Sequence, residues 1–297
     1  MSDVPQIFDR ALLRRRMERA LAEGAERFLL ERVADDLDDR LATVSRRFAA
    51  SLDLGTPGRE AVQRVAARYG VAVPLVHDCA GLAPDRLADD LESPGLERGS
   101  ADLVVSLMAL QGINDLPGLL AQVWAALVPD GLFIAALAGG QTLTELRQSL
   151  LVAEEAVSGG AAPRIFPFAD VRALGQLMQR AGFALPVVDS ETITVRYADP
   201  LALMHDLRAM GATNVLSDRA RRPLGRRVLL TAVDHYLDHF ADADGRVRAT
   251  FEIIWLSGWA PHPRQQQPLK PGSAKMRLAD ALAVKTYGPA GGEEEQR

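Results

Sequence analysis

Three short segments of the chain carry residues that could recognise a nucleoside. Gly55 follows an apolar stretch, where a glycine lets the backbone approach a bound group and the N–H groups of the following helix can hold a carboxylate. Asp78 follows a second apolar stretch, where a carboxylate can accept hydrogen bonds from both ribose hydroxyls. Asp90 and the backbone N–H of Leu91 are candidates for recognising adenine. The order of these residues predicts a pocket for an adenosyl cofactor, although any one aspartate here is more often a turn or capping residue.

Apolar stretches around these residues predict the elements that position them. The sequence predicts a strand at 52–54, a helix at 59–69, a second strand at 71–76 and a strand at 101–110 apolar enough to be buried on both faces. A strand, a helix and a strand followed by an acidic residue open a doubly wound α/β sheet, which binds ligands at the carboxyl ends of its strands. We therefore predict a Rossmann-like α/β domain.

Two amphipathic helices are predicted before the first strand. Apolar side chains recur on one side of the chain from Arg10 to Leu21 and again from Phe28 to Leu41. We expect these helices, within residues 1–50, to form a lid over the mouth of the pocket. The arginines at 14–16 and 19 crowd the other side of the first helix. We interpret them as a solvated surface, and the alternative is a grip on an acidic partner or on the cofactor.

Further predicted helices and strands continue the α/β domain to residue 260. Helices are predicted at 114–127, 142–156, 168–181, 200–210 and 228–240, and strands at 132–137, 187–197 and 250–259, the last of which should close the sheet. We assign residues 51–260 to this domain, with insertions around 141–170 and 198–245, and expect the loop at 158–163 to close over a substrate. Residues 261–297 are rich in Pro, Gln and Gly and are predicted to be a largely disordered tail.

Composition argues against several classes of function. The 297 residues are 48% hydrophobic, which is enough for a substantial core, and the net charge of -5 gives no basic footprint for nucleic acid. The longest apolar runs, such as Leu132 to Ala138, are far shorter than a membrane-crossing helix, and the N-terminus has no signal-peptide core, so we expect the protein to stay in the compartment where it is made. The single cysteine, Cys79, argues against a disulfide framework and a cysteine-rich metal site.

A pair of histidines near the C-terminal part of the domain has a spacing that metal sites use. His235 and His239 are four positions apart on a predicted helix and therefore share a face. The glutamate of a metalloprotease motif is missing, because Tyr236 follows His235. Since aspartates surround them in the sequence, we interpret the two histidines as exposed surface residues and predict no metal site.

Several motifs resemble those of a known family. They are Phe8-Asp9-Arg10, Asp102-Leu103-Val104-Val105-Ser106, Asn114-Asp115-Leu116-Pro117, Pro129-Asp130-Gly131, Gly140-Gln141-Thr142-Leu143, Arg180-Ala181-Gly182-Phe183, Leu203-Met204-His205-Asp206-Leu207, Met210-Gly211-Ala212-Thr213-Asn214 and Ser257-Gly258-Trp259. The chain resembles class I S-adenosylmethionine-dependent methyltransferases over nearly its whole length. Within this class it resembles bacterial relatives of mitochondrial complex I assembly factor 5, which are also similar to the malonyl-carrier-protein methyltransferases of biotin synthesis.

The resemblance implies a seven-stranded methyltransferase sheet that binds S-adenosylmethionine. The residues that it implies around the cofactor are Asp53, Gly55, Gly58, Asp78, Asp90, Leu91 and Ser106. It also implies a protein substrate, a peripheral-arm subunit of NADH:quinone oxidoreductase, on which the family is associated with hydroxylation of an arginine rather than with methyl transfer.

The glycine loop departs from the pattern of that family. Where the family has Asp-x-Gly-x-Gly-x-Gly, this chain has Pro57 and Arg59 at the second and third glycine positions, with Gly58 between them. Proline removes a backbone donor, and its ring occupies space that the methionine end of the cofactor would approach, although Gly58 could restore the turn by a shift of register. Three functions stay open: an enzyme that modifies a protein, a non-catalytic assembly chaperone, and a methyltransferase acting on a carrier protein or small molecule.

Overall fold

Six strands form one mixed sheet in the order β2-β1-β3-β4-β6-β5. In this computed structural model, which describes residues 4–79, 88 and 90–265, the strands are β1 (Ser51–Leu54), β2 (Leu75–Val76), β3 (Ala101–Leu107), β4 (Leu127–Ala138), β5 (Ala184–Tyr197) and β6 (Val247–Trp259). The first four are parallel, and β6 is antiparallel to both of its neighbours. The chain lays β2 on one side of β1 and β3 on the other, and such a change of direction marks the ligand-binding end of a doubly wound sheet.

Two strand predictions need correction. The strand predicted at 250–259 was expected to close the sheet, but β6 lies between β4 and β5, and β5 is the edge strand. The strand predicted at 71–76 is reduced to Leu75–Val76, because Pro74 has no N–H group to donate to a sheet ladder and only its carbonyl oxygen bonds to β1. The α/β fold class is confirmed. The described residues form six strands, so the seventh stays a prediction.

All the predicted helices are present, with their ends shifted by a few residues. They are α1 (Arg10–Glu23), α2 (Phe28–Ala42), α3 (Glu60–Tyr69), α4 (Leu116–Ala126), α5 (Thr144–Ser158), α6 (Val171–Arg180), α7 (Pro200–Ala209) and α8 (Arg226–Phe240), with a short 3-10 turn, η1 (Leu110–Gly112). The side chains of Asp9, Asp115, Asp170 and Asp199 accept hydrogen bonds from first-turn N–H groups and so fix four of the helix starts. Among the described residues, no helix is long and apolar enough to cross a membrane.

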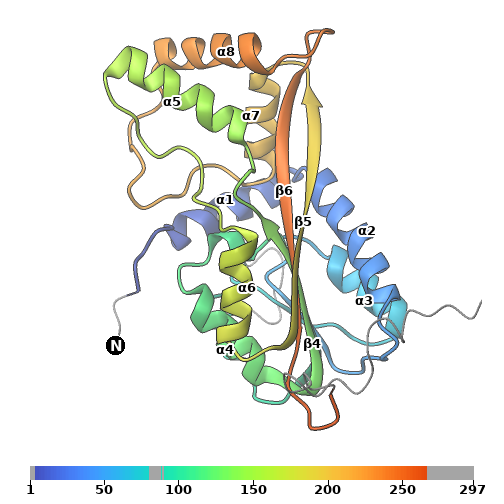
Figure 1. Cartoon of the computed structure of the whole chain (residues 1–297). Coiled ribbons are helices and arrows are strands. Elements are labelled where there is room, and N and C mark those ends of the chain that lie inside the picture. Colours follow the sequence, from blue (N-terminus) through green and yellow to red (C-terminus); the bar gives the residue numbers. More distant parts are fainter. Residues whose placement is uncertain (1–3, 80–87, 89, 266–297) are drawn as a thin grey trace, which may run out of the picture. The chain divides into compact units, whose positions relative to one another are not determined.

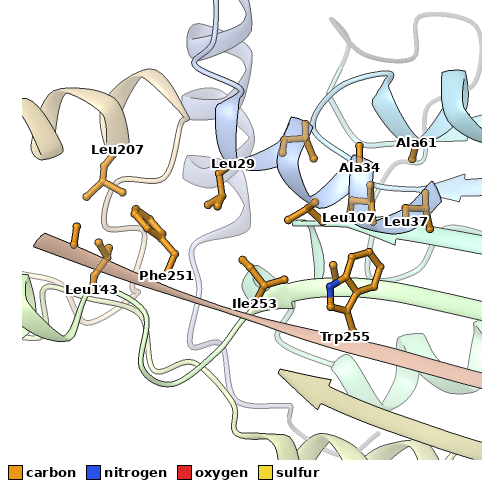
Figure 2. Packing of buried hydrophobic residues seen from close by; sticks show 14 of the residues in the cluster. Leu29, Ala34, Leu37, Ala61, Leu107, Leu143, Leu207, Phe251, Ile253 and Trp255 are labelled. Atoms are coloured by element: carbon orange, nitrogen blue, oxygen red, sulfur yellow. The ribbon is translucent and has the colours of Figure 1, made fainter. Parts of the chain in front are cut away.

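The sheet separates two clusters of buried side chains. Helices α2 and α3 pack on one face of the sheet, and α4 and α6 pack on the other (Figure 1). The first cluster extends from α2 to the far end of β6, where Leu29, Leu207 and Phe251 belong to one apolar group (Figure 2). Helices α5, α7 and α8 gather at that end of the β5–β6 pair (Figure 1). This helical end therefore stands beside the carboxyl ends of the parallel strands.

Residues up to His262 form one compact unit. The disordered tail predicted for 261–297 falls almost entirely outside the described residues.

Candidate functional site

A cavity of about 340 Å³ opens at the carboxyl ends of β1, β2 and β3. Its volume is at the lower end of the range for small-molecule pockets, roughly 300–1,000 Å³. Gly55, His77, Asp78 and Leu91 line one part of it, together with Pro57 from the turn after β1. Three residues that the sequence predicted for a nucleoside pocket, Gly55, Asp78 and Leu91, are thus brought together on one wall.

Gly55 allows two parts of this wall to come together. Its backbone has a φ of +80°, which favours glycine, and a Cβ added there would lie 2.6 Å from Cδ2 of Leu91 and 3.1 Å from Cβ of Ala109. Leu91 is only 2% exposed, so its packed side chain has little open space into which it could move away from an added Cβ. The turn after β1 therefore accepts only glycine at this position.

Asp78 presents a largely buried carboxylate to the cavity. Its side chain is 8% exposed, and its Oδ2 accepts a hydrogen bond of 2.8 Å from Nη2 of Arg10 on α1. Nη1 of the same arginine donates to the carbonyl oxygen of Gly112 at 3.2 Å. An ionised carboxylate offers about four lone-pair positions, so Asp78 keeps acceptors for other donors while it is paired with Arg10.

His77 and Cys79, on either side of Asp78, are held in their neutral forms. Burial lowers the pKa of His77 to about 4, although the nearby Asp78 carboxylate opposes the shift. Burial, followed by the Asp78 charge, raises the pKa of Cys79 to about 12. Nδ1 of His77 accepts a hydrogen bond of 2.9 Å from the backbone N–H of Cys79. The His77 ring is therefore a neutral acceptor at physiological pH.

The same three residues form a candidate ligand group for a metal ion that the sequence analysis missed. Ligand atoms of His77, Asp78 and Cys79 lie within 4.8 Å of one another. A His-Asp-Cys run at the end of a strand was the available signal. Because Arg10 already supplies the cation beside Asp78 and the Cys79 N–H occupies Nδ1 of His77, a metal ion would have to displace both.

Asp53 and Ser106, which the family resemblance implies at the cofactor, lie beneath the cavity rather than on its wall. Ser106 Oγ donates to the carbonyl oxygen of Leu54 at 2.6 Å. The hydroxyl Oγ1 of Thr56 donates to Oδ1 of Asp53 at 2.6 Å. The same hydroxyl oxygen of Thr56 accepts a hydrogen bond from the N–H of Leu107 at 3.0 Å. Burial raises the pKa of Asp53 to about 7. These bonds connect β1 and β3, and a cofactor contact by Asp53 or Ser106 stays a prediction.

Gly58 and Asp90 are also placed away from the cavity wall. A Cβ at Gly58 would lie 1.8 Å from Oε2 of Glu60, whose Oε1 accepts a hydrogen bond of 3.2 Å from Arg27. The carboxylate beside the start of α3 is therefore that of Glu60. Asp90 is exposed, and its Oδ1 accepts a hydrogen bond of 3.0 Å from the N–H of Glu92. This is the turn-capping role that the sequence analysis set against adenine recognition.

The cavity continues into a region that the sequence analysis did not foresee, which we call the apolar chamber. It is lined by Leu143, Leu146, Leu150, Phe166, Phe168, Met204, Leu207 and Phe251. Arg164 is at its edge, where its Nε donates to Oε1 of Glu154 at 2.9 Å. These residues come from α5, α7, β6 and the segment before α6, and no local pattern in the sequence brings them together.

The N-terminal helices contribute residues to the cavity, a lid over its mouth stays a prediction, and the prediction for the arginines needs correction only at Arg16. Arg10, Leu13 and Met17 of α1 line the cavity. Arg14 also lines it, and Arg16 is half-buried with its Nη1 donating to the carbonyl oxygen of Asn214 at 2.5 Å. Arg14, Arg15 and Arg19 are exposed, as predicted for a solvated surface, so the departure is confined to Arg16.

The histidine pair lies on α8, away from this cavity. The rings of His235 and His239 are stacked, with their centroids 4.1 Å apart. His235 is half-buried rather than exposed, and its Nδ1 is 3.1 Å from Oγ of Ser149 on α5. The part of the chain that the structure describes brings no third His, Cys, Asp or Glu ligand to this pair.

Strand order and the position of the cavity define the class: the protein has a class I methyltransferase fold. The YcgJ protein of Bacillus subtilis superposes with a TM-score of 0.50 at 12% sequence identity, covering 75% of this chain and 97% of that one. This similarity concerns the fold alone. No family model matches the chain.

Two sets of curated relatives identify the family. Arginine-hydroxylase NDUFAF5, mitochondrial, of Danio rerio is 35% identical over 290 residues, which cover 94% of this chain and 90% of the relative. Malonyl-[acyl-carrier protein] O-methyltransferase of Laribacter hongkongensis is 32% identical over 286 residues, which cover 89% of this chain and 94% of the relative. The chain belongs to the family of arginine-hydroxylase NDUFAF5, and the resemblance found in its sequence is confirmed.

Proposed function

We propose that the protein binds S-adenosylmethionine in the cavity and modifies an arginine of a protein substrate. The observation that carries this proposal is the wall formed by Gly55, Asp78 and Leu91 at the carboxyl ends of the first strands. The substrate that the family implies is a peripheral-arm subunit of NADH:quinone oxidoreductase, with hydroxylation as the modification. Converting an arginine C–H to C–OH is a two-electron oxidation, so this reaction would require dioxygen and a two-electron reductant in addition to the cofactor. We propose that the protein acts in the bacterial cytoplasm, as the same resemblance implies.

The residues on the cavity wall fit the nucleoside half of the cofactor. Gly55 leaves room for Leu91 to pack against the turn after β1, and the two residues line the part of the cavity proposed for the base. Asp78 has free lone pairs for the ribose hydroxyls. When bound, S-adenosylmethionine supplies a methyl group on a sulfonium. The apolar chamber continues from this wall and would surround the aliphatic part of a substrate side chain while excluding water from it.

A second candidate function is methyl transfer to an acyl group on a carrier protein. Of the charged residues that line the cavity, four are arginines and two are acidic: Arg10, Arg14, Arg27, Arg164, Glu26 and Asp78. Three of these arginines are already paired with carboxylates: Arg10 with Asp78, Arg27 with Glu60 and Arg164 with Glu154. Among the described residues, Arg14 is therefore the lining cation that could attract an anionic substrate, such as a malonyl carboxylate. The relatives named malonyl-carrier-protein methyltransferases agree with such a substrate. A non-catalytic assembly chaperone is the third candidate and requires no cofactor.

Mass spectrometry of NADH:quinone oxidoreductase subunits tests the first candidate. Cells lacking the gene would be complemented with the wild-type protein or with Asp78→Asn. We expect an arginine of a peripheral-arm subunit to carry one additional oxygen atom only with the wild-type protein. One additional methylene group instead would mean methylation.

Two further measurements separate the remaining candidates. Methyl incorporation into malonyl carrier protein would establish the second function. If the subunits are unmodified and cells with Asp78→Asn still assemble the complex normally, the non-catalytic assembly chaperone is the remaining candidate. Calorimetry with S-adenosylhomocysteine tests the cofactor directly, because absence of binding at millimolar ligand means a binding free energy weaker than about 4 kcal/mol.

A further inference from the structure

We propose that Arg10 is a positioning residue of the nucleoside site, which makes helix α1 part of that site. Arg10 orients the Asp78 carboxylate so that its remaining lone pairs can accept the ribose hydroxyls of an adenosyl ligand. This inference rests on the proposed function, because it assumes that such a ligand binds. Its test is chosen so that the two can fail separately.

The Arg10 guanidinium connects three parts of the cavity wall. Its Nη2 donates to Oδ2 of Asp78 at 2.8 Å, and its Nη1 donates to the carbonyl oxygen of Gly112 at 3.2 Å. Its Nε lies 3.7 Å from Oε1 of Glu92, close to Leu91 on the wall. The end of β2, the η1 turn and the segment after Leu91 are therefore all tied to one side chain of α1.

Burial makes the Arg10–Asp78 pair strongly interdependent. The side chains of Arg10 and Asp78 are only 16% and 8% exposed. A buried charge is costly unless an opposite charge and hydrogen bonds compensate it, and an arginine does not lose its proton in a protein. Without Arg10, the carboxylate would lose its paired charge and the hydrogen bond that orients it, and this loss would weaken it as an acceptor for ribose.

The sequence neighbours of Asp78 do not replace Arg10. His77 Nδ1 lies 3.4 Å from Oδ1 of Asp78, but that nitrogen accepts the Cys79 N–H and has no proton to share. Sγ of Cys79 is 3.9 Å from the same oxygen and is a weak donor. Within the described part of the chain, Arg10 is the cation paired with Asp78. The strong hydrogen bond to this carboxylate thus comes from α1.

The start of α1 is also held by contacts that do not involve Arg10. Asn114 accepts a hydrogen bond from the backbone N–H of Phe8 at 2.7 Å and donates one to its carbonyl oxygen at 3.1 Å. Nη2 of Arg219 donates to Oδ2 of Asp9 at 3.3 Å. Arg16 donates to the carbonyl oxygen of Asn214 at 2.5 Å. Removal of the Arg10 guanidinium should therefore affect Asp78 without releasing the helix.

The experiment compares adenosine with 2′-deoxyadenosine by calorimetry on the full chain. The measured quantity is the ribose ratio, which is the Kd for 2′-deoxyadenosine divided by the Kd for adenosine. We expect a ribose ratio of about ten or more for the wild-type protein, as for loss of a charge-assisted hydrogen bond. Arg10→Met should bring the ratio close to one, and Arg10→Lys should restore part of it. Arg16→Met is the matched control: it loses an α1 contact distant from Asp78 and should keep the wild-type ratio.

Each outcome supports or overturns the inference. If Arg10→Met weakens both nucleosides equally and keeps the wild-type ribose ratio, Arg10 has only a structural role and the inference is wrong. If Arg10→Met does not fold, as judged by circular dichroism, the Arg10→Lys variant decides instead. A wild-type ribose ratio in Arg10→Lys would show that the ratio does not depend on the guanidinium geometry, and the inference would be wrong. If the wild-type protein binds neither nucleoside nor S-adenosylhomocysteine, the proposed function itself fails, and the inference fails with it.

Discussion

The end of β2 and the turn after β1 border the same cavity but differ in how closely they match a methyltransferase site. At the end of β2, Asp78 faces the cavity with acceptors available for a ribose. In the turn after β1, Pro57 lies on the wall, and Glu60 places its own carboxylate beside the start of α3. A cofactor carboxylate would meet negative charge there. The comparison indicates that nucleoside recognition and recognition of the amino-acid end of the cofactor can be altered separately in this fold.

The largest effect is expected for Gly55→Ala. The added Cβ would meet Leu91 and Ala109 in a backbone with positive φ, so we expect the free energy of unfolding to fall by about 2–4 kcal/mol. Gly70→Ala is the control, because its φ is +70° but nothing lies within 4 Å of the added Cβ. It should cost only the backbone strain, about 1 kcal/mol. Equal losses in chemical denaturation would show that the close approach to Leu91 is unimportant.

The two strand ends should also respond to pH with opposite signs. The pKa of His77 is about 4 in the folded protein and 6.5 ordinarily, so between these values the unfolded chain binds a proton that the folded chain does not. His77 therefore makes the free energy of unfolding fall as the pH falls through this window, by roughly 3 kcal/mol at most. Asp53 has a pKa of about 7 in the folded protein instead of 3.8, so between these values the folded chain keeps a proton that the unfolded chain has lost. Asp53 therefore makes the free energy of unfolding fall as the pH rises from 3.8 to 7.

Single variants separate these opposing contributions. In His77→Gln only the Asp53 contribution remains, so its free energy of unfolding should fall relative to that of the wild type as the pH rises from 4 to 6.5. In Asp53→Asn the His77 contribution remains, and the relative free energy of unfolding should rise over the same range. Denaturant midpoints measured across this range check both signs. Parallel pH profiles for the two variants would contradict the assignment.

A smaller effect sharpens the comparison of the two ends directly. Pro57→Gly returns a backbone N–H and flexibility to the turn after β1. We expect affinity for S-adenosylhomocysteine to rise about fivefold, the effect of one hydrogen bond of about 1 kcal/mol, while affinity for adenosine stays unchanged. Calorimetry with both ligands measures the difference. Equal gains for the two ligands would mean that Pro57 restricts the entire site rather than its amino-acid end.

Asp90→Ala should have the smallest effect. Asp90 is exposed, and among the described residues its carboxylate bonds to the nearby backbone of Glu92, so the free energy of unfolding should change by no more than about 0.5 kcal/mol. Adenosine affinity should be unchanged, in contrast to that of Asp78→Asn. A tenfold loss of adenosine affinity would place Asp90 at the adenine after all, as the family resemblance implies.

Local patterns in the sequence were sufficient for the features that depend on neighbouring residues. Gly55 and Asp78 were placed together because each follows a recognisable strand, and parallel strands align their carboxyl ends. Leu91 was placed with them by its order in the chain. The direction of a side chain was harder to predict. Ser106 lies in the expected strand, but its hydroxyl bonds to β1 beneath the cavity rather than facing a ligand. A shift of one residue along a strand reverses the face to which a side chain points.

Features that depend on distant pairing could not be obtained from the sequence. Arg10 and Asp78 are 68 residues apart, and neither residue type nor spacing indicates that they pair. The apolar chamber combines α5, α7 and β6, each of which has an ordinary apolar face. The position of β6 inside the sheet also depends on a pairing choice between strands, since its apolar sequence suits an edge position with a covered face as well as an internal one.

That position of β6 has a consequence for biosynthesis. β6 is made after β4 and β5, yet it provides the ladder that joins them. A nascent chain that has not yet released residues 247–259 from the ribosome leaves the adjoining edge of β4 and all of β5 without their shared neighbour. The sheet can therefore be completed only after residues 247–259 have been made, and premature termination before this strand would expose two long strand edges to aggregation.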